Sequence, residues 1–178
     1  MLGAGADTTI VATSREPLDV AGEQLYVLPT LSLPDVSEST EAIGCAEAVQ
    51  LCVDRAQRQR HGFALTDANV ATVAQICTRL GGIPLALELV AARVRSLTIE
   101  EINGRLSACA LLRLAGRLAR VGQMEQAERL MAEAFPLMEN AGWPKLLADY
   151  FSTHGFVKWM EGDLAPARTS YQRAVEQY

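Results

Sequence analysis

Residues 81–84, Gly-Gly-Ile-Pro, are the part of the sequence best suited to line a ligand. Glycine ends a helix readily because it adopts the left-handed conformation at little cost. Pro84 suits the first turn of the next helix, where its missing N–H group is not needed. We therefore expect a rigid corner with exposed backbone that can line a bound molecule; the alternative is an ordinary corner between two helices. Residues 85–94 are apolar on nearly every face, which predicts a buried helix.

The segments around this corner predict a mainly α protein with one or two short N-terminal strands. Residues 8–14 are β-branched and apolar, which favours a strand, and residues 24–33 alternate apolar residues with prolines and polar residues, as an edge strand does. Helical spacing predicts helices over residues 46–60 and from a Thr66–Asp67 cap to Leu80. A capping box at residues 98–101 predicts another helix from there to about residue 106.

Four motifs occur in an order that resembles the second half of a STAND-type (NB-ARC-like) regulatory ATPase domain. The best match is to bacterial LuxR- and SARP-type transcriptional regulators, and it covers roughly residues 8–106. The motifs are Ala-Thr-Ser-Arg-Glu-Pro-Leu at 12–18, Leu-x-x-Leu-x-Leu at 28–33, Glu-Ala-Val-Gln-Leu at 47–51 and Gly-Gly-Ile-Pro-Leu-Ala-Leu-Glu-Leu at 81–89.

The resemblance implies roles for four residues. Arg15 would contact the terminal phosphate of a bound ATP or ADP, a task that suits a planar, permanently charged guanidinium. The alternative for Arg15 is a solvated charge at a strand end. Gly82, Ile83 and Pro84 would pack beside the adenine. In the intact family the nucleotide is accompanied by magnesium.

The chain departs from the family where the phosphates should bind. A phosphate-binding loop needs a glycine-rich turn that leads into a helix, with a lysine and a Ser/Thr that positions magnesium. The glycine-rich residues 3–7 do not lead into a helix, and the two lysines, Lys145 and Lys158, lie in the carboxyl half. No apolar strand ends in paired acidic residues either. We therefore expect no ATP hydrolysis and no cofactor, and we interpret the chain as a truncated or internally deleted regulator.

After residue 106 the family would continue into a winged helix, but the chain repeats itself instead. Small and bulky residues recur at an offset of 40, and the second copy resembles a tetratricopeptide repeat (TPR). We expect Gly162 in the turn between the two helices of its repeat. The positions expected to pack the repeats are Ala115, Gly122, Ala127, Met131 and Ala134, matched by Gly155, Gly162, Ala167, Tyr171 and Ala174.

These patterns divide the chain into three parts. Residues 1–36 are predicted to be a remnant of the nucleotide-binding sheet, with a strand at about 8–14 and an extended segment at about 24–33. Residues 37–106 would form a helical subdomain of the NB-ARC type. Residues 107–178 would hold two TPR-like repeats, at about 111–140 and 148–178. The unpaired edge of the remaining strand predicts self-association.

The charge, the apolar runs and the cysteine and histidine positions limit the classes of function that fit this sequence. The first 106 residues carry 8 arginines and 13 acidic residues, and the rest carry 8 basic and 8 acidic residues. Neither part offers the clustered positive charge that direct nucleic-acid binding needs. No apolar run of eighteen residues predicts a membrane span, and the four cysteines and the two isolated histidines do not form a metal-binding pattern. We predict that the cysteines are small core residues in the cytoplasm.

Three functions fit these observations to different degrees. The first is a non-catalytic part of a STAND regulator that binds a protein or peptide through its TPR groove. The second is a stand-alone TPR adaptor with no nucleotide role. The third, an enzyme of another class, lacks a nucleophile–base pair, a metal cluster or a carboxylate dyad in the sequence.

Overall fold

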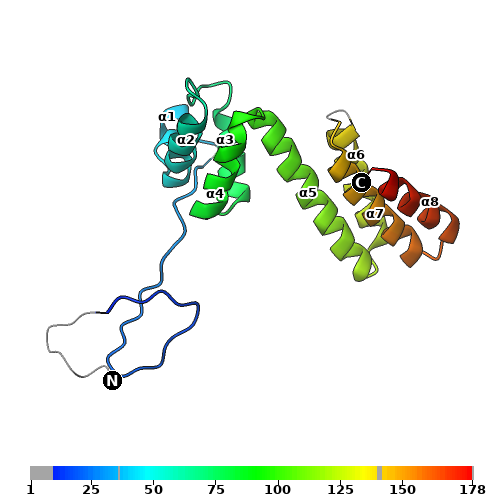
Figure 1. The fold of residues 1–178 in the computed structure, drawn as a ribbon, viewed down its shortest axis with the longest axis horizontal. Helices are drawn as coiled ribbons and strands as arrows, with labels where there is room; N and C mark the ends of the chain where they lie inside the picture. Colours follow the sequence, from blue (N-terminus) through cyan, green and yellow to red (C-terminus); the bar gives the residue numbers. More distant parts are fainter. Residues whose placement is uncertain (1–9, 36, 140–141, 178) are drawn as a thin grey trace.

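The computed structural model describes residues 10–35, 37–139 and 142–177, and from residue 40 onward this part of the chain consists of helices joined by short connections (Figure 1). The elements are eight α-helices and one short 3-10 helix, all within the described residues. In chain order they are α1 (Thr40–Gly44), α2 (Glu47–Gln59), α3 (Val70–Arg79), α4 (Pro84–Ala91), η1 (Ala92–Arg95), α5 (Ile99–Arg120), α6 (Met124–Glu139), α7 (Pro144–Met160) and α8 (Leu164–Glu176).

The two predicted N-terminal strands are not formed in the described part of their segments. Residues 10–30 run as an extended chain away from the helices, and Val11, Tyr26 and Val27 are more than four-fifths exposed (Figure 1). A strand needs a neighbour for its backbone hydrogen bonds, and even a pair of strands is only marginally stable. Within the described chain no second strand lies beside residues 10–14 or 24–33, so their β-branched composition alone does not make a sheet.

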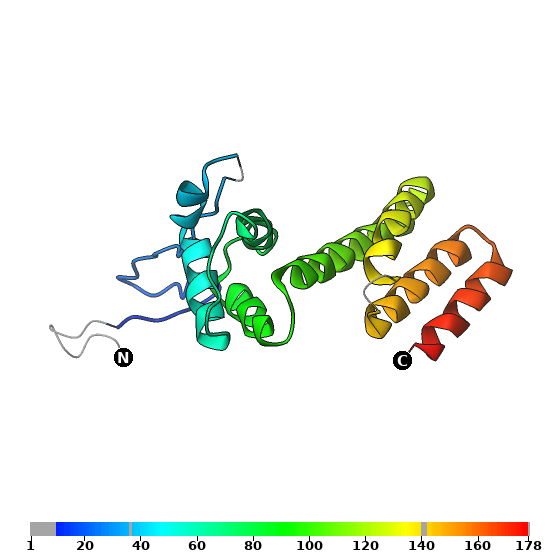
Figure 2. The same cartoon turned by 90° about the horizontal axis from the view of Figure 1, so that it is seen from above.

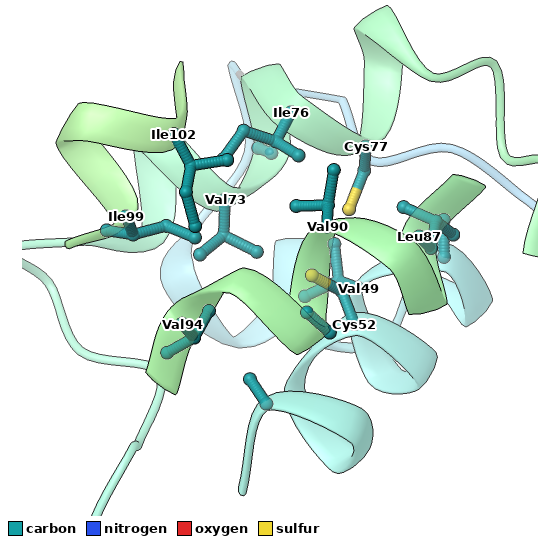
Figure 3. Close-up of a cluster of buried hydrophobic side chains, with 14 of the residues drawn as sticks. Val49, Cys52, Val73, Ile76, Cys77, Leu87, Val90, Val94, Ile99 and Ile102 are labelled. Atoms are coloured by element: carbon teal, nitrogen blue, oxygen red, sulfur yellow. The ribbon is translucent and has the colours of Figure 1, made fainter. Parts of the chain in front are cut away.

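The first four helices, η1 and the start of α5 enclose one hydrophobic core (Figure 3). Helix α2 keeps the predicted bounds to within one residue at each end. Helix α3 begins at Val70, later than the Thr66–Asp67 cap suggested, because Asn69 Oδ1 accepts from the Thr66 N–H group and holds the preceding turn out of the helix. The buried side chains come from every one of these elements; among the largest are Val49, Val73, Ile76, Leu87 and Val94.

Helix α4 corrects the prediction of a fully buried helix. Leu87, Val90 and Ala91 are buried, but Leu85 and Leu89 are 64% and 62% exposed. The reason is that α4 packs on α2 and η1 with one side only. An apolar surface is therefore left exposed beside the corner that precedes this helix.

Helix α5 is much longer than predicted and joins the two parts of the molecule (Figures 1 and 2). The predicted capping box is present, since the Thr98 N–H group donates to Glu101 and the Glu101 N–H group donates to Thr98 Oγ1. Ile102 lies in the first core, whereas Leu112 lies in a second core farther along the same helix. The helix thus continues through the domain boundary predicted at residues 106 and 107.

The carboxyl half consists of two antiparallel helix pairs, α5 with α6 and α7 with α8 (Figure 2). Helix α7 also packs against both α5 and α6, which joins the pairs into one layered unit. Pro136 lies inside α6, a position that the sequence patterns did not indicate. Both pairs begin earlier than the predicted repeat bounds, at Ile99 and Pro144.

The cysteines only partly follow the prediction that all four are core residues. Cys52 and Cys77 are buried side by side in the first core, but Cys45 and Cys109 are exposed (Figure 3). Cys45 is the capping residue at the end of α1, whereas Cys52 lies within α2. All four are free thiols.

Candidate functional site

The corner at residues 81–84 has the backbone that the glycines predicted. Gly81 and Gly82 have φ angles of 62° and 66°, in the left-handed region, and Pro84 is the first residue of α4. Ile83 is 51% exposed, and with the exposed Leu85 and Leu89 it forms an apolar surface at the start of α4. This surface is chemically suited to a flat apolar group, although it carries no charged side chain for phosphates.

The chain itself already occupies one side of this corner. The Leu31 N–H group donates to the carbonyl oxygen of Gly82 at 3.0 Å. The next residue, Ser32, exchanges two hydrogen bonds of 3.0 Å with Glu47: its N–H group donates to the carboxylate, and the Glu47 N–H group donates to Ser32 Oγ. These bonds hold the end of the extended segment across the start of α2.

Sequence reasoning missed this contact. Ser32 and Glu47 are 15 residues apart. No local pattern links a serine in a loop with a glutamate at such a distance, so only the fold reveals the pair.

Arg15 is not brought to the corner. It lies in the exposed extended segment, and within the described residues it has no ion pair or side-chain hydrogen bond. Residues 10–20 lie well away from α4 (Figure 1). The proposed phosphate contact and the proposed adenine corner are therefore not assembled into one site in this structure.

A second candidate surface is a groove between α5 and α7. It has a volume of about 290 Å³, is open to solvent, and combines apolar side chains with an arginine, an aspartate and hydroxyl groups. None of these residues was singled out from the sequence, because each is unremarkable by itself and they meet only when the two helices pack. The lining residues are Cys109, Leu112, Arg113, Leu146, Asp149, Ser152 and Thr153.

Charge is mixed in this groove. Partial burial raises the pKa of the Cys109 thiol, and the negative charge of Asp149 raises it further, while Arg113 and Arg105 act in the opposite direction. The thiol is therefore held in its neutral form, so it is a weak nucleophile. The groove can offer hydrogen bonds and apolar contact to a bound chain, but it shows no arrangement for nucleophilic chemistry.

A smaller hollow of about 160 Å³ lies where α6, α7 and α8 meet. His154 Nδ1 and Ser170 Oγ are 2.8 Å apart, and the His154 ring stacks on Tyr150 with centroids 6.0 Å apart. Burial lowers the pKa of His154, and the nearby Lys158 lowers it further. The imidazole is therefore mainly neutral at pH 7 and serves as a partner for the serine.

The residues expected to pack the repeats lie in and around the helix pairs. Gly122 and Gly162 occupy the turns between paired helices, with φ angles of 82° and 83°. Gly155 and Tyr171 are in close contact across α7 and α8, and Tyr171 remains 42% exposed. The fully or almost fully buried alanines are Ala115, Ala127, Ala134, Ala167 and Ala174, and Met131 is buried beside them.

The described residues hold neither a metal-binding cluster nor a membrane-spanning helix. No group of three or more His, Cys, Asp or Glu side chains is placed to hold a metal ion. No helix in this part of the chain has both the length and the apolar character needed to cross a membrane.

Comparison with known proteins gives relatives from mycobacteria. A Mycobacterium tuberculosis protein named "Putative HTH-type transcriptional regulator" is 44% identical over 129 residues, which is 72% of this chain and 13% of the relative. A Mycobacterium bovis protein with the same description matches equally. A second M. tuberculosis protein, named only as uncharacterized, is 43% identical over 99 residues, 56% of this chain and 22% of its own length.

The chain thus spans 13% of the length of the regulators that it matches. No family model matches the chain, and no solved structure matches it.

Proposed function

We propose that this chain is a non-catalytic part of a bacterial transcriptional regulator of the STAND type, and that it acts by binding a protein or peptide through TPR-like helix pairs. The observation that supports the regulator part of the proposal is the 44% identity, over 72% of the chain, to proteins named as HTH-type transcriptional regulators. In this proposal the chain works in the cytoplasm and does not contact DNA or a membrane itself.

The α5–α7 groove is the surface proposed for the partner. Arg113 lies on the α5 wall, so an extended peptide can place an acidic group against it, while Leu112 and Leu146 contact its apolar side chains. Small ligands fit this groove less well than a peptide does, because α5 and α7 form an open hollow rather than an enclosed cavity.

The corner at residues 82–84 is proposed to be a non-catalytic remnant. Its glycines and proline remain, but Lys145 and Lys158 both lie on α7, far along the chain from any glycine-rich loop. A nucleotide would have an apolar surface for its base and no cradle for its phosphates. We therefore expect neither tight nucleotide binding nor ATP hydrolysis.

A titration with fluorescent ATP and ADP analogues tests the nucleotide part of the proposal. The expected result is no saturation below about millimolar nucleotide, since a millimolar Kd corresponds to only about 4 kcal/mol of binding free energy. Micromolar binding that weakens on Arg15→Ala would show an assembled nucleotide site. Release of phosphate from Mg-ATP by the purified chain would overturn the proposal outright.

A peptide library selected on the full chain tests the groove. Selected peptides should lose about tenfold or more in affinity, or about 1.4 kcal/mol, on Arg113→Glu. The matched control is Arg129→Glu, which makes the same charge change on the exposed surface of α6, outside the groove. Peptides that respond only to the α6 variant would rule out the groove as the peptide site.

A further inference from the structure

Cys52 and Cys77 form a pair of thiols that takes no part in the groove or in the corner at residues 81–84. Cys52 lies in the middle of α2 and Cys77 near the end of α3, and both side chains are 0% exposed. Their sulfur atoms point toward one another inside the first core (Figure 3). Contact with the Cys52 thiol raises the pKa of Cys77, and burial raises it further. Two thiols that are 25 positions apart in the sequence are therefore direct neighbours in the fold.

The backbones around the two thiols are not held apart by large side chains. Ala48 and Ala56 lie one turn before and one turn after Cys52 on the same face of α2, and Ala74 lies one turn before Cys77 on α3. All three alanines are 0% exposed, and α2 packs against α3. A disulfide requires Cα atoms about 4.4–6.8 Å apart. Small side chains on both helices allow such a close approach.

The surroundings of the two thiols are aliphatic. The buried members of the first core are all aliphatic apart from the two cysteines, and Val49 and Val90 lie beside them (Figure 3). In such surroundings a thiol stays neutral near pH 7, so neither cysteine is a fast nucleophile by itself. Once one sulfur is oxidised, however, the other is already in place to react with it. The arrangement therefore favours a cross-link within the molecule over other products of oxidation.

We propose that Cys52 and Cys77 form a site of reversible oxidation, at which a small uncharged peroxide links α2 to α3 through a disulfide. Disulfides of intracellular proteins are usually transient and respond to redox conditions, which suits a reversible link. The site goes beyond the function proposed above and does not depend on it, because neither the α5–α7 groove nor a nucleotide takes part.

The reaction consumes hydrogen peroxide in two steps. One cysteine, as its thiolate, attacks a peroxide oxygen; the O–O bond breaks, a sulfenic acid forms, and the departing hydroxide takes up the released proton as water. The second cysteine, as its thiolate, attacks the sulfenic sulfur; the S–S bond forms, the S–O bond breaks, and a second water leaves. The two thiols are oxidised and the peroxide is reduced. An added dithiol reverses the link by thiol–disulfide exchange.

The link should stabilise the first core. A disulfide removes conformational freedom from the unfolded chain between the two cysteines. The oxidised protein should therefore melt about 5 °C or more above the reduced protein. Cys77 lies in the last turns of α3, and Gly81 directly follows the residue that caps this helix, so the link also restrains the approach to the corner.

The test uses the full chain with Cys45→Ser and Cys109→Ser, because these two exposed thiols would otherwise link separate molecules. The folded protein is treated with hydrogen peroxide, denatured and alkylated with iodoacetamide, and its mass is measured. The expected product is a monomer that is not alkylated and is about 2 Da lighter than the reduced chain. Proteolysis should then yield a fragment in which Cys52 and Cys77 are joined. Dithiothreitol should restore two alkylatable thiols and the original melting temperature.

Cys77→Ala in the same background is the matched control, and Cys52→Ala repeats it from the other helix. Each variant leaves one thiol without its partner, so oxidation should cause neither the loss of mass nor the rise in melting temperature. Circular dichroism checks that both variants are folded. The linked fragment is identified in the background protein itself, so the main result does not depend on either core substitution.

Several results would overturn the proposal. One is that both thiols stay reduced under conditions that oxidise the exposed Cys45 of the native chain. Another is a gain of oxygen without a cross-link, or a link that forms only after denaturation. A disulfide that leaves the melting temperature unchanged or lowers it would contradict the proposal as well. Failure of the nucleotide or peptide experiments described above does not change any of these outcomes.

Discussion

The carbonyl oxygen of Leu31 lies so close to Gly82 that a Cβ atom built on this glycine would be 2.3 Å from it. The residue at position 82 must therefore be a glycine for two reasons, because its φ angle of 66° is also in the left-handed region. The extended N-terminal segment and the corner before α4 fit together only through this absence of a side chain.

Replacing Gly82 with alanine should destabilise the protein more than replacing Gly81. Both glycines have left-handed φ angles, which cost an L-residue roughly 1–2 kcal/mol. Only at Gly82 does the added Cβ also meet the Leu31 backbone; nothing lies within 4 Å of the one at Gly81. Chemical denaturation of both variants measures the difference, and equal free energies of unfolding would show that Leu31 does not stay at the corner.

The capping box of α5 should contribute measurably to stability. Thr98→Ala removes the acceptor of the Glu101 N–H group, and loss of such a cap costs about 0.5–2 kcal/mol. Ser39→Ala is a useful comparison, since it removes a longer cap bond of 3.3 Å from the five-residue helix α1. We expect Ser39→Ala to lower the free energy of unfolding less than Thr98→Ala does. Thermal or urea unfolding of both variants measures this difference. A Thr98→Ala variant as stable as the native protein would contradict the stabilising role of the capping box.

Overpacking the α7–α8 interface should destabilise the second helix pair. Ala167 and Ala174 are each 4% exposed, so the added volume of Ala167→Leu or Ala174→Leu has no free space, at a cost of about 1–3 kcal/mol. Ala165→Leu places the same side chain on the exposed surface of α8 and should change little. Differential scanning calorimetry compares the three. An unchanged melting temperature in both interface variants would mean that the two helices pair differently.

Acidification should destabilise the protein through His154. Burial, helped by Lys158, lowers the pKa of His154 below its ordinary value of 6.5. The unfolded chain therefore binds this proton more readily, so the stability that His154 contributes is present above pH 6.5 and is lost as the pH falls through the folded-state pKa. The free energy of unfolding of the native chain should thus decrease between about pH 7.5 and pH 5.

The matched variants for this prediction are His154→Gln and His61→Gln. Glutamine can still hydrogen-bond to Ser170 but does not titrate, so His154→Gln should flatten part of the decrease. His61 is exposed in a loop, and its replacement should preserve the native pH profile. If the two profiles coincide, His154 does not carry the effect.

Local sequence patterns predicted the helices well and the N-terminal segment badly. Helix α2, the capping box and the turn glycines depend on interactions within a few residues, and such interactions are readable from the chain. The strands at 8–14 and 24–33 depend on a neighbour, which the described chain does not supply. The exposure of Leu85 and Leu89 likewise depends on which elements cover α4, information that apolar composition does not contain.

The candidate sites were harder to predict than the fold. The Gly82–Pro84 corner was found because its residue types impose a particular backbone. Arg113 and Asp149 meet in a groove only through the packing of α5 on α7, and their separation along the sequence follows no motif.

The continuity of α5 has a practical consequence for dissecting the molecule. At about 1.5 Å per residue, its 22 residues form a rod of about 33 Å that bears side chains of all three hydrophobic cores. A cut between residues 106 and 107 would end the amino-terminal piece after about two turns of α5 and leave residues 107–120, which carry the α5 side chains of the second and third cores, without the capping residue. Separate expression of the carboxyl half should therefore begin at Thr98, with the capping residue retained, and the amino half would then need a substitute for Ile99 and Ile102.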